Sequence, residues 1–140
     1  MNPGSAQESE ILSPDDCARL LEGESVGRLA IVAHGRPQIF PINYKFAEGV
    51  VLFRSSAGFK LEHSPMSDVA FEIDHVDLQA GVAWSVLVEG VAYRITDAMD
   101  PLATRLRGVA LQPLAPGAHE EWIGIYPSVI SGRRFPIHTG

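Results

Sequence analysis

The segment from Phe40 to Glu62 (FPINYKFAEGVVLFRSSAGFKLE) constrains the fold more than any other part of the chain. Phe40, Ile42, Tyr44 and Phe46 alternate before a turn at 47–49, and an apolar run over 50–53 follows it, which is the pattern of two antiparallel strands joined by a tight turn. Pro41 cannot donate a ladder hydrogen bond, so we expect the first strand to lie at a sheet edge or to open locally there. The second strand leads into a short helix predicted over 56–63.

Polar and basic side chains gather where this second strand meets the predicted helix. They are Arg54, Ser55, Ser56 and Lys60. Backbone N–H groups at a helix N-terminus attract phosphate, hydroxyls add donors, and cationic side chains add charge. The cluster therefore indicates a phosphate site, although the same residues are also typical of a solvated turn in which Ser56 caps the helix.

The rest of the chain alternates strands with turns and short helices. Strands are predicted over 27–33, 36–46, 50–55, 67–77, 82–96, 121–126 and 130–137, and helices over 13–23, 56–63 and 100–110. In the longest strand, the parity of the apolar residues changes at Glu89-Gly90, which indicates a β-bulge. The pattern predicts one domain over 11–140, a small mainly β barrel with short flanking helices, after a disordered lead-in over 1–10.

Composition excludes several classes of function. The net charge is −6 and the pI about 5.3, which argues against a nucleic-acid binder. No apolar run is long enough to cross a bilayer, and the polar start of the chain does not resemble a secretory signal, so we expect a cytoplasmic protein. The five histidines are scattered and none has metal-ligand spacing with another or with Cys17, so we predict no metal site.

Six segments, in this order and spacing, resemble a known family. They are VGRLAIV (26–32), FPINY (40–44), VLFRSSAGFK (51–60), VAFEID (69–74), AWSVLVEG (83–90) and ISGRR (130–134). Together they resemble the pyridoxamine 5'-phosphate oxidase-like, FMN-binding split barrels, most closely the branch that contains nitroimidazole-reductase-like proteins. The resemblance implies a six-stranded antiparallel split β-barrel and a homodimer with two flavin sites at the subunit interface.

The resemblance also implies which residues bind the flavin. The backbone of Pro41, Ile42, Asn43 and Tyr44 would meet the isoalloxazine ring, and Arg54, Ser55, Ser56 and Lys60 would hold the 5'-phosphate of FMN. Trp84 and Ser85 would approach the ring or the ribityl chain, often across the dimer, and Arg133 would point at the site. From the residues alone, Tyr44 and Trp84 are equally typical of core aromatic side chains.

The function that the resemblance implies is an FMN-dependent oxidoreductase acting on an unidentified small molecule, with no catalytic residue assigned. The chain is much shorter than true pyridoxamine phosphate oxidases and lacks their C-terminal clamp for pyridoxal phosphate, so we do not expect pyridoxamine phosphate to be the substrate. Two alternatives stay open: a reductase that uses the deazaflavin coenzyme, and a non-catalytic split-barrel module that binds flavin or haem.

Overall fold

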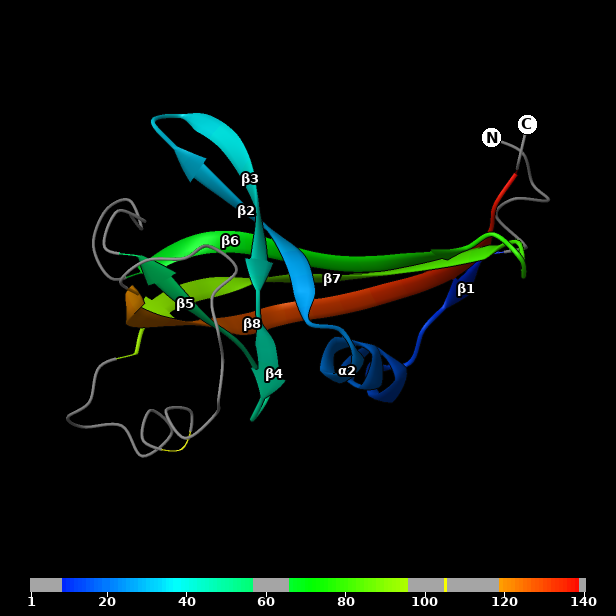
Figure 1. Ribbon diagram of the computed structural model, residues 1–140, viewed down its shortest axis with the longest axis horizontal. Helices are drawn as coiled ribbons and strands as arrows, with labels where there is room; N and C mark the ends of the chain where they lie inside the picture. The colour runs from blue at the N-terminus through cyan, green and yellow to red at the C-terminus, as the bar shows by residue number, and fades with distance from the viewer. Residues whose placement is uncertain (1–8, 57–65, 96–104, 106–118, 139–140) are drawn as a thin grey trace.

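In the described residues, an antiparallel sheet curls around an apolar core and one helix packs against it (Figure 1). A computed structural model describes residues 9–56, 66–95, 105 and 119–138. The elements are β1 (Glu10–Ile11), α2 (Pro14–Gly23), β2 (Val26–Ala33), β3 (Arg36–Asn43), β4 (Lys45–Ala47), β5 (Val50–Ser56), β6 (Met66–Asp77), β7 (Val82–Arg94) and β8 (His119–Pro136).

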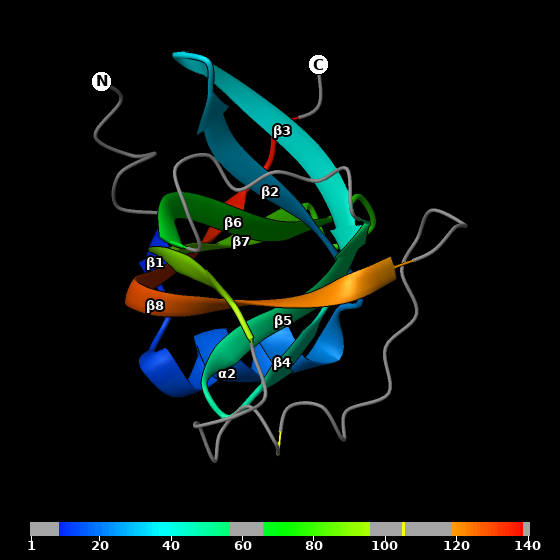
Figure 2. The same ribbon diagram turned by 90° about the vertical axis from the view of Figure 1, so that its left-hand side faces the viewer.

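The strands follow the order β3-β2-β6-β7-β8-β5-β4, and β1 pairs with β8. Figure 2 shows how the sheet curls, with the β2–β3 hairpin on one side and β5 and β4 on the other. The predicted mainly β split barrel is confirmed. The described residues form eight strands, whereas the resemblance implied six and the apolar pattern predicted seven. Compared with the seven predicted segments, β1 is an additional strand, 36–46 is divided into β3 and β4, and 121–126 and 130–137 are joined in β8.

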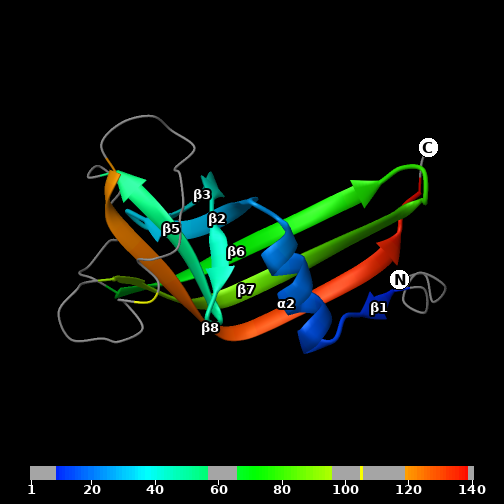
Figure 3. The same ribbon diagram turned by 60° about the horizontal axis from the view of Figure 1, so that its bottom comes forward.

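The helix α2 begins and ends close to its predicted bounds. The Asp16 amide donates a hydrogen bond to Ser13 Oγ at 3.1 Å, and Pro14 occupies the first turn. Cys17 and Leu21 are buried in the main core. Figure 3 shows α2 lying across β7 and β8, and the helix contacts both of these strands and β4. No helix in the described residues is long and apolar enough to cross a membrane.

Tyr44 separates β3 from β4 and carries the chain from one side of the barrel to the other. Its amide donates to the Ser25 carbonyl at 3.0 Å, and its hydroxyl donates to the Leu21 carbonyl at 2.6 Å. These two bonds hold the chain against α2 and the turn that follows it. Because β3 is the last strand at its end of the sheet, Pro41 lies in an edge strand, as predicted.

The predicted bulge lies at the predicted place but in the neighbouring strand. Glu89 pairs with Val129 and Gly90 with Pro127, so the extra residue is Ser128 of β8. Gly90 is required here because a Cβ atom would come within 2.3 Å of the Tyr126 carbonyl oxygen. The predicted strands over 121–126 and 130–137 are one continuous strand, β8, which bends at this bulge.

Since β7 itself has no extra residue, the change in its apolar parity has another cause. Val86 and Val88 face the main core, whereas Ile95 joins a second apolar cluster with Val50 and Leu52. The change in parity therefore falls between Val86 and Val88 of β7, which face the main core, and Ile95, which directly follows the strand and packs on the opposite face. We call the face of the sheet that carries Phe71 and Val88 the inner face, and the opposite face the outer face.

Three predicted segments fall outside the described residues. They are most of the lead-in over 1–10, most of the helix over 56–63, and the helix over 100–110 apart from Arg105. Ser56 is described as the end of β5, and Arg105 forms an ion pair with Glu48 at 2.7 Å.

Candidate functional site

Cross-strand pairing brings residues far apart in sequence onto one outer face. Pro41 pairs with Arg28, which pairs with Glu72, and Glu72 pairs with Leu87. Partners directly opposite each other in a sheet project to the same side, so this row crosses β3, β2, β6 and β7 on the outer face. Ser131 of β8 completes the row through its pairing with Leu87.

A second row on the same face carries two of the predicted flavin residues. Asp74 pairs with Ser85, Ser85 with Arg133, and Arg133 with Ile11. Ser85 and Arg133 also line a cavity of about 350 Å³ together with Ile11, Leu87, Ser131 and Gly132. The structure thus brings together a guanidinium, two hydroxyls and two aliphatic side chains in one pocket.

A close approach of the backbone to α2 underlies this pocket. Gly132 is buried, and a Cβ atom at this position would lie 2.7 Å from Cys17 Sγ. Ser131 and Arg133, its neighbours in β8, project to the other side of the sheet. The close packing of Gly132 against α2 therefore holds this part of β8 in place, and the side chains of Ser131 and Arg133 point outward from it.

Three charged residues that the sequence analysis did not assign to the site form an ion cluster beside it. Arg28 Nη2 lies 2.6 Å from Glu72 Oε1 and 3.0 Å from Asp74 Oδ1, and Arg28 Nε donates to Glu72 Oε1 at 3.0 Å. Burial and the hydrogen bond with Asp74 raise the pKa of Glu72, although Arg28 acts in the opposite direction. The outer face therefore holds two carboxylates that share one cation.

A sequence signal for this cluster existed. Arg28 is the one charged residue in the strand GRLAIVA, and Glu72 and Asp74 alternate with apolar residues in DVAFEIDHVD. Charged residues that alternate with core residues share one face of a strand. What the sequence lacked was the register that sets Arg28 opposite Glu72.

The predicted ring-binding segment divides between the two faces. Pro41 and Asn43 pair with Arg28 and Val26, on the outer face. Ile42 packs against the main core, and the ring of Tyr44 is buried with its centroid 4.7 Å from that of Phe71. The side chains of Ile42 and Tyr44 are therefore core residues, and these two positions offer only their backbone to a ligand.

Trp84 points away from Ser85, although the two are adjacent in sequence. Its indole packs against the main core, and its centroid lies 6.2 Å from that of His75. The structure therefore does not bring Trp84 to the pocket that Ser85 and Arg133 line. Trp84 instead packs against the core, which was the alternative that its residue type alone allowed.

The predicted phosphate cluster is described only in part. Arg54 lies in β5, where its Cζ atom is 5.1 Å from the centroid of the Trp122 ring, within the range of a cation–π contact. Ser55 and Ser56 end β5 and their side chains are outside the described part, as is the whole of Lys60. The grouping of these four residues therefore stays a prediction.

Arg54 and Arg133 are held at opposite ends of β8. Arg54 pairs with Trp122 and Arg133 with Ile11, so β5 lies beside the first part of β8 and β1 beside its end (Figure 3). At about 3.3 Å per residue, the strand path between Trp122 and Arg133 is roughly 35 Å. One chain therefore presents two separate groups of predicted flavin residues.

Comparison with known proteins decides the family. The family model described as "Pyridoxamine 5'-phosphate oxidase" matches residues 13–134. This chain belongs to the pyridoxamine 5'-phosphate oxidase-like family. An uncharacterized protein of Mycobacterium tuberculosis is 30% identical over 139 residues, which cover 95% of this chain and 90% of that protein. The family model's match extends from the start of α2 to Arg134, near the end of β8.

Solved members of the same fold support this assignment. One is the crystal structure of a Corynebacterium glutamicum protein that is named a pyridoxamine 5'-phosphate oxidase. It matches with a TM-score of 0.76 and 28% identity, over 94% of this chain and 97% of that one. The FAD-binding protein from Mycobacterium smegmatis has a TM-score of 0.73 and 33% identity over 91% of this chain and 98% of its own. The expected split-barrel fold is thus confirmed for this family member.

Proposed function

We propose that this protein is a homodimeric, flavin-binding oxidoreductase that acts on a small molecule. The proposal is supported by family membership over residues 13–134 and by the likeness to a relative that binds FAD. The observation that carries it is the outer-face pocket, where Ser85 and Arg133, two residues that the resemblance assigns to the flavin site, lie together although they are 48 residues apart in sequence.

The chemistry of this pocket fits a flavin. A flavin combines a flat, largely apolar ring with hydrogen-bonding edges and an anionic phosphate chain. Leu87 and Ile11 provide aliphatic contact area, Ser85 and Ser131 provide hydroxyls, and Arg133 provides a cation with several donors. When bound, a flavin supplies hydride and electron transfer, and the protein supplies orientation and electrostatics.

The separation of the two groups along β8 supports a site built from two copies of the chain. The path along β8 between the positions of Arg54 and Arg133 is roughly 35 Å, with the bulge at Ser128 between them. We infer that one cofactor takes Arg54 from one copy of the chain and Arg133 from the other. In this arrangement Arg54 binds the phosphate of the FMN, and the pocket of the second copy closes over the rest.

Subunit complementation tests the shared site. Arg54→Ala and Arg133→Ala should each weaken FMN binding about tenfold, which corresponds to ~1.4 kcal/mol. Unfolding and refolding an equal mixture of the two variants should restore a fraction of high-affinity sites, because a mixed dimer carries one site with both arginines. The measurement is flavin fluorescence on titration, with sedimentation to establish the dimer. A mixture no better than either variant alone would contradict a shared site.

FMN is the cofactor we propose, and FAD is the rival that the names of the relatives suggest. Titration of the flavin-free protein with FMN, FAD and the deazaflavin coenzyme ranks the three by affinity. Tightest binding of FMN would support the predicted 5'-phosphate site, and tightest binding of either other cofactor would replace FMN in the proposal. Oxidation of NADPH by the loaded protein with a nitroaromatic acceptor separates an enzyme from a binding module.

A further inference from the structure

A second pocket opens on the outer face where β2 and β6 separate. The two strands pair only over Arg28–Ala30 and Ala70–Glu72, and beyond Ala30 the β2–β3 hairpin turns away from the sheet (Figure 1). The wedge between them is a cavity of about 450 Å³, in the size range of small-molecule sites. None of the residues that line it belongs to the predicted flavin site.

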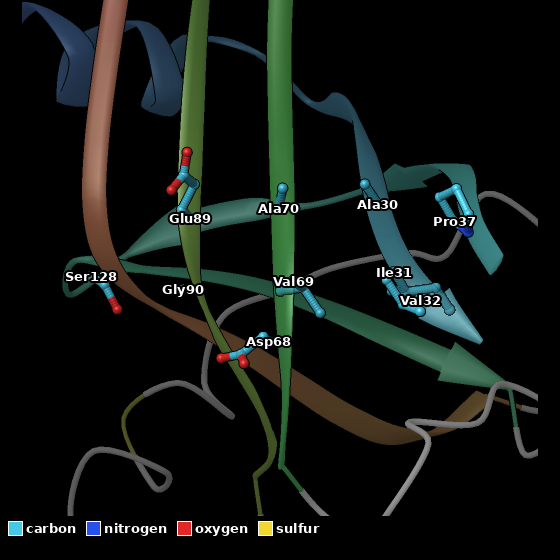
Figure 4. A pocket seen from close by; sticks show the side chains of 10 residues that line it. All are labelled: Ala30, Ile31, Val32, Pro37, Asp68, Val69, Ala70, Glu89, Gly90 and Ser128. Atoms are coloured by element: carbon cyan, nitrogen blue, oxygen red, sulfur yellow. The ribbon is translucent and has the colours of Figure 1, made fainter. Parts of the chain in front are cut away.

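The two sides of this pocket differ in chemistry. Figure 4 shows Ala30, Val32 and Pro37 on one side of β6, and the carboxylates of Asp68 and Glu89 on the other. Asp68 and Glu89 are diagonal neighbours on one face, because Ala70 pairs with Glu89 and Asp68 lies two residues further along β6. An aliphatic wall thus stands opposite an anionic rim.

The charge on this rim has no counterpart in the described residues. Glu72 and Asp74, further along β6, share the cation Arg28. By contrast, within the described residues neither Asp68 nor Glu89 has an ion pair or a hydrogen bond of its side chain. Two carboxylates that flank an apolar cavity favour a ligand that brings its own positive charge.

We propose that this pocket is a binding site for a small organic cation, with an apolar body against Ala30 and Val32 and an ammonium group between Asp68 and Glu89. The Ser128 hydroxyl, at the bulge of β8, lies on the anionic side and can accept a hydrogen bond from the same ammonium. The bulge and the divergence of the hairpin together create the site. The proposal does not depend on bound flavin.

The test uses the full, isotope-labelled protein without flavin and three probes of matched size: benzylammonium, benzyl alcohol and benzoate. Benzylammonium should give saturable NMR shifts at Ala30, Val32 and Ala70. Benzyl alcohol should bind about tenfold more weakly, and benzoate should not bind there. Raising the salt concentration should weaken the binding of benzylammonium.

Variants give the second arm of the test. Asp68→Asn combined with Glu89→Gln should weaken benzylammonium about tenfold, whereas Glu22→Gln on α2 should leave its affinity unchanged. Thermal melting checks that the variants fold, and the single substitutions replace the double variant if it does not. Equal binding of benzyl alcohol, unchanged affinity in the carboxylate variants, or no saturable shift at these residues would overturn the proposal.

Discussion

The inner and outer faces of β6 and β7 belong to the same strands, yet the inner face is buried and apolar whereas the outer face carries polar and charged residues. Inner residues such as Phe71, Ile73, Val86 and Val88 are completely buried. Outer residues one step away, such as Glu72 and Ser85, are polar or charged and line pockets or ion clusters. Alternation along a strand therefore lets one face provide stability while the other carries the candidate sites.

Adjacent residues make the contrast sharpest. Trp84 is directed to the inner face and Ser85 to the outer face, and Tyr44 is a core residue next to the outer-face residue Asn43. A family resemblance assigns such neighbours to one site as a block. The pleat of the strand separates them, because consecutive side chains point to opposite sides.

The largest expected effect comes from truncating the same side chain on each face. Val88 is fully buried on the inner face, and Val129, on β8 at the bulge, is 53% exposed on the outer face. Val88→Ala should lower the free energy of unfolding by about 2 kcal/mol, because it loses transfer energy and leaves a cavity. Val129→Ala should change it by less than about 0.5 kcal/mol. Urea unfolding measures both, and equal losses would break the distinction between the faces.

A smaller effect is expected from removing a hydroxyl. Tyr44→Phe leaves the buried Leu21 carbonyl without its 2.6 Å hydrogen bond and should cost about 1–2 kcal/mol. Tyr93→Phe, on the outer face where the ring is 38% exposed, is the matched control and should cost less than about 0.5 kcal/mol. Flavin affinity should be unchanged in Tyr44→Phe, and a large loss of affinity would show that the hydroxyl contacts the cofactor.

The smallest effect concerns the dependence of stability on pH. The pKa of Glu72 is raised from its ordinary value of 4.5, chiefly by burial, so the folded state holds this proton more tightly than the unfolded state does. The contribution of Glu72 to the free energy of unfolding therefore falls as pH rises through its titration. Glu72→Gln should thus gain stability relative to the native protein as pH rises from about 4 to 8.

Thermal melts across this pH range measure the difference between Glu72→Gln and the native protein. Glu22→Gln on α2, measured in parallel, gives the background of an exposed Glu-to-Gln change. A difference that is constant with pH, or that shifts in the opposite direction, would contradict the raised pKa of Glu72.

Much of the fold follows from local signals in the sequence. Ser13 and Pro14 mark the start of α2, and Pro41 marks an edge strand, because capping and the missing N–H are properties of single residues. The position of the bulge also followed from the pattern at Glu89-Gly90. Which strand carries the extra residue did not, since that depends on a pairing with β8.

The candidate site was less predictable than the fold, for the same reason. The sequence named Ser85 and Arg133 through resemblance, but only the register shows that they are direct partners. Arg28 was not assigned to the site because its role depends on its pairing with Glu72, which lies 44 residues away in sequence. Long-range pairing, which no local pattern encodes, decides which side chains meet.

Flavin titration of two variants, at neighbouring positions of β8, tests most directly whether the flavin site lies on the outer face. Arg133 faces the outer pocket, whereas Arg134 faces the other way and forms an ion pair with Glu10 at 3.3 Å. Arg133→Ala should raise the dissociation constant for flavin about tenfold, and Arg134→Ala should leave it within about twofold. Equal affinities in the two variants, or a larger loss in Arg134→Ala, would contradict the placement of the flavin site on the outer face.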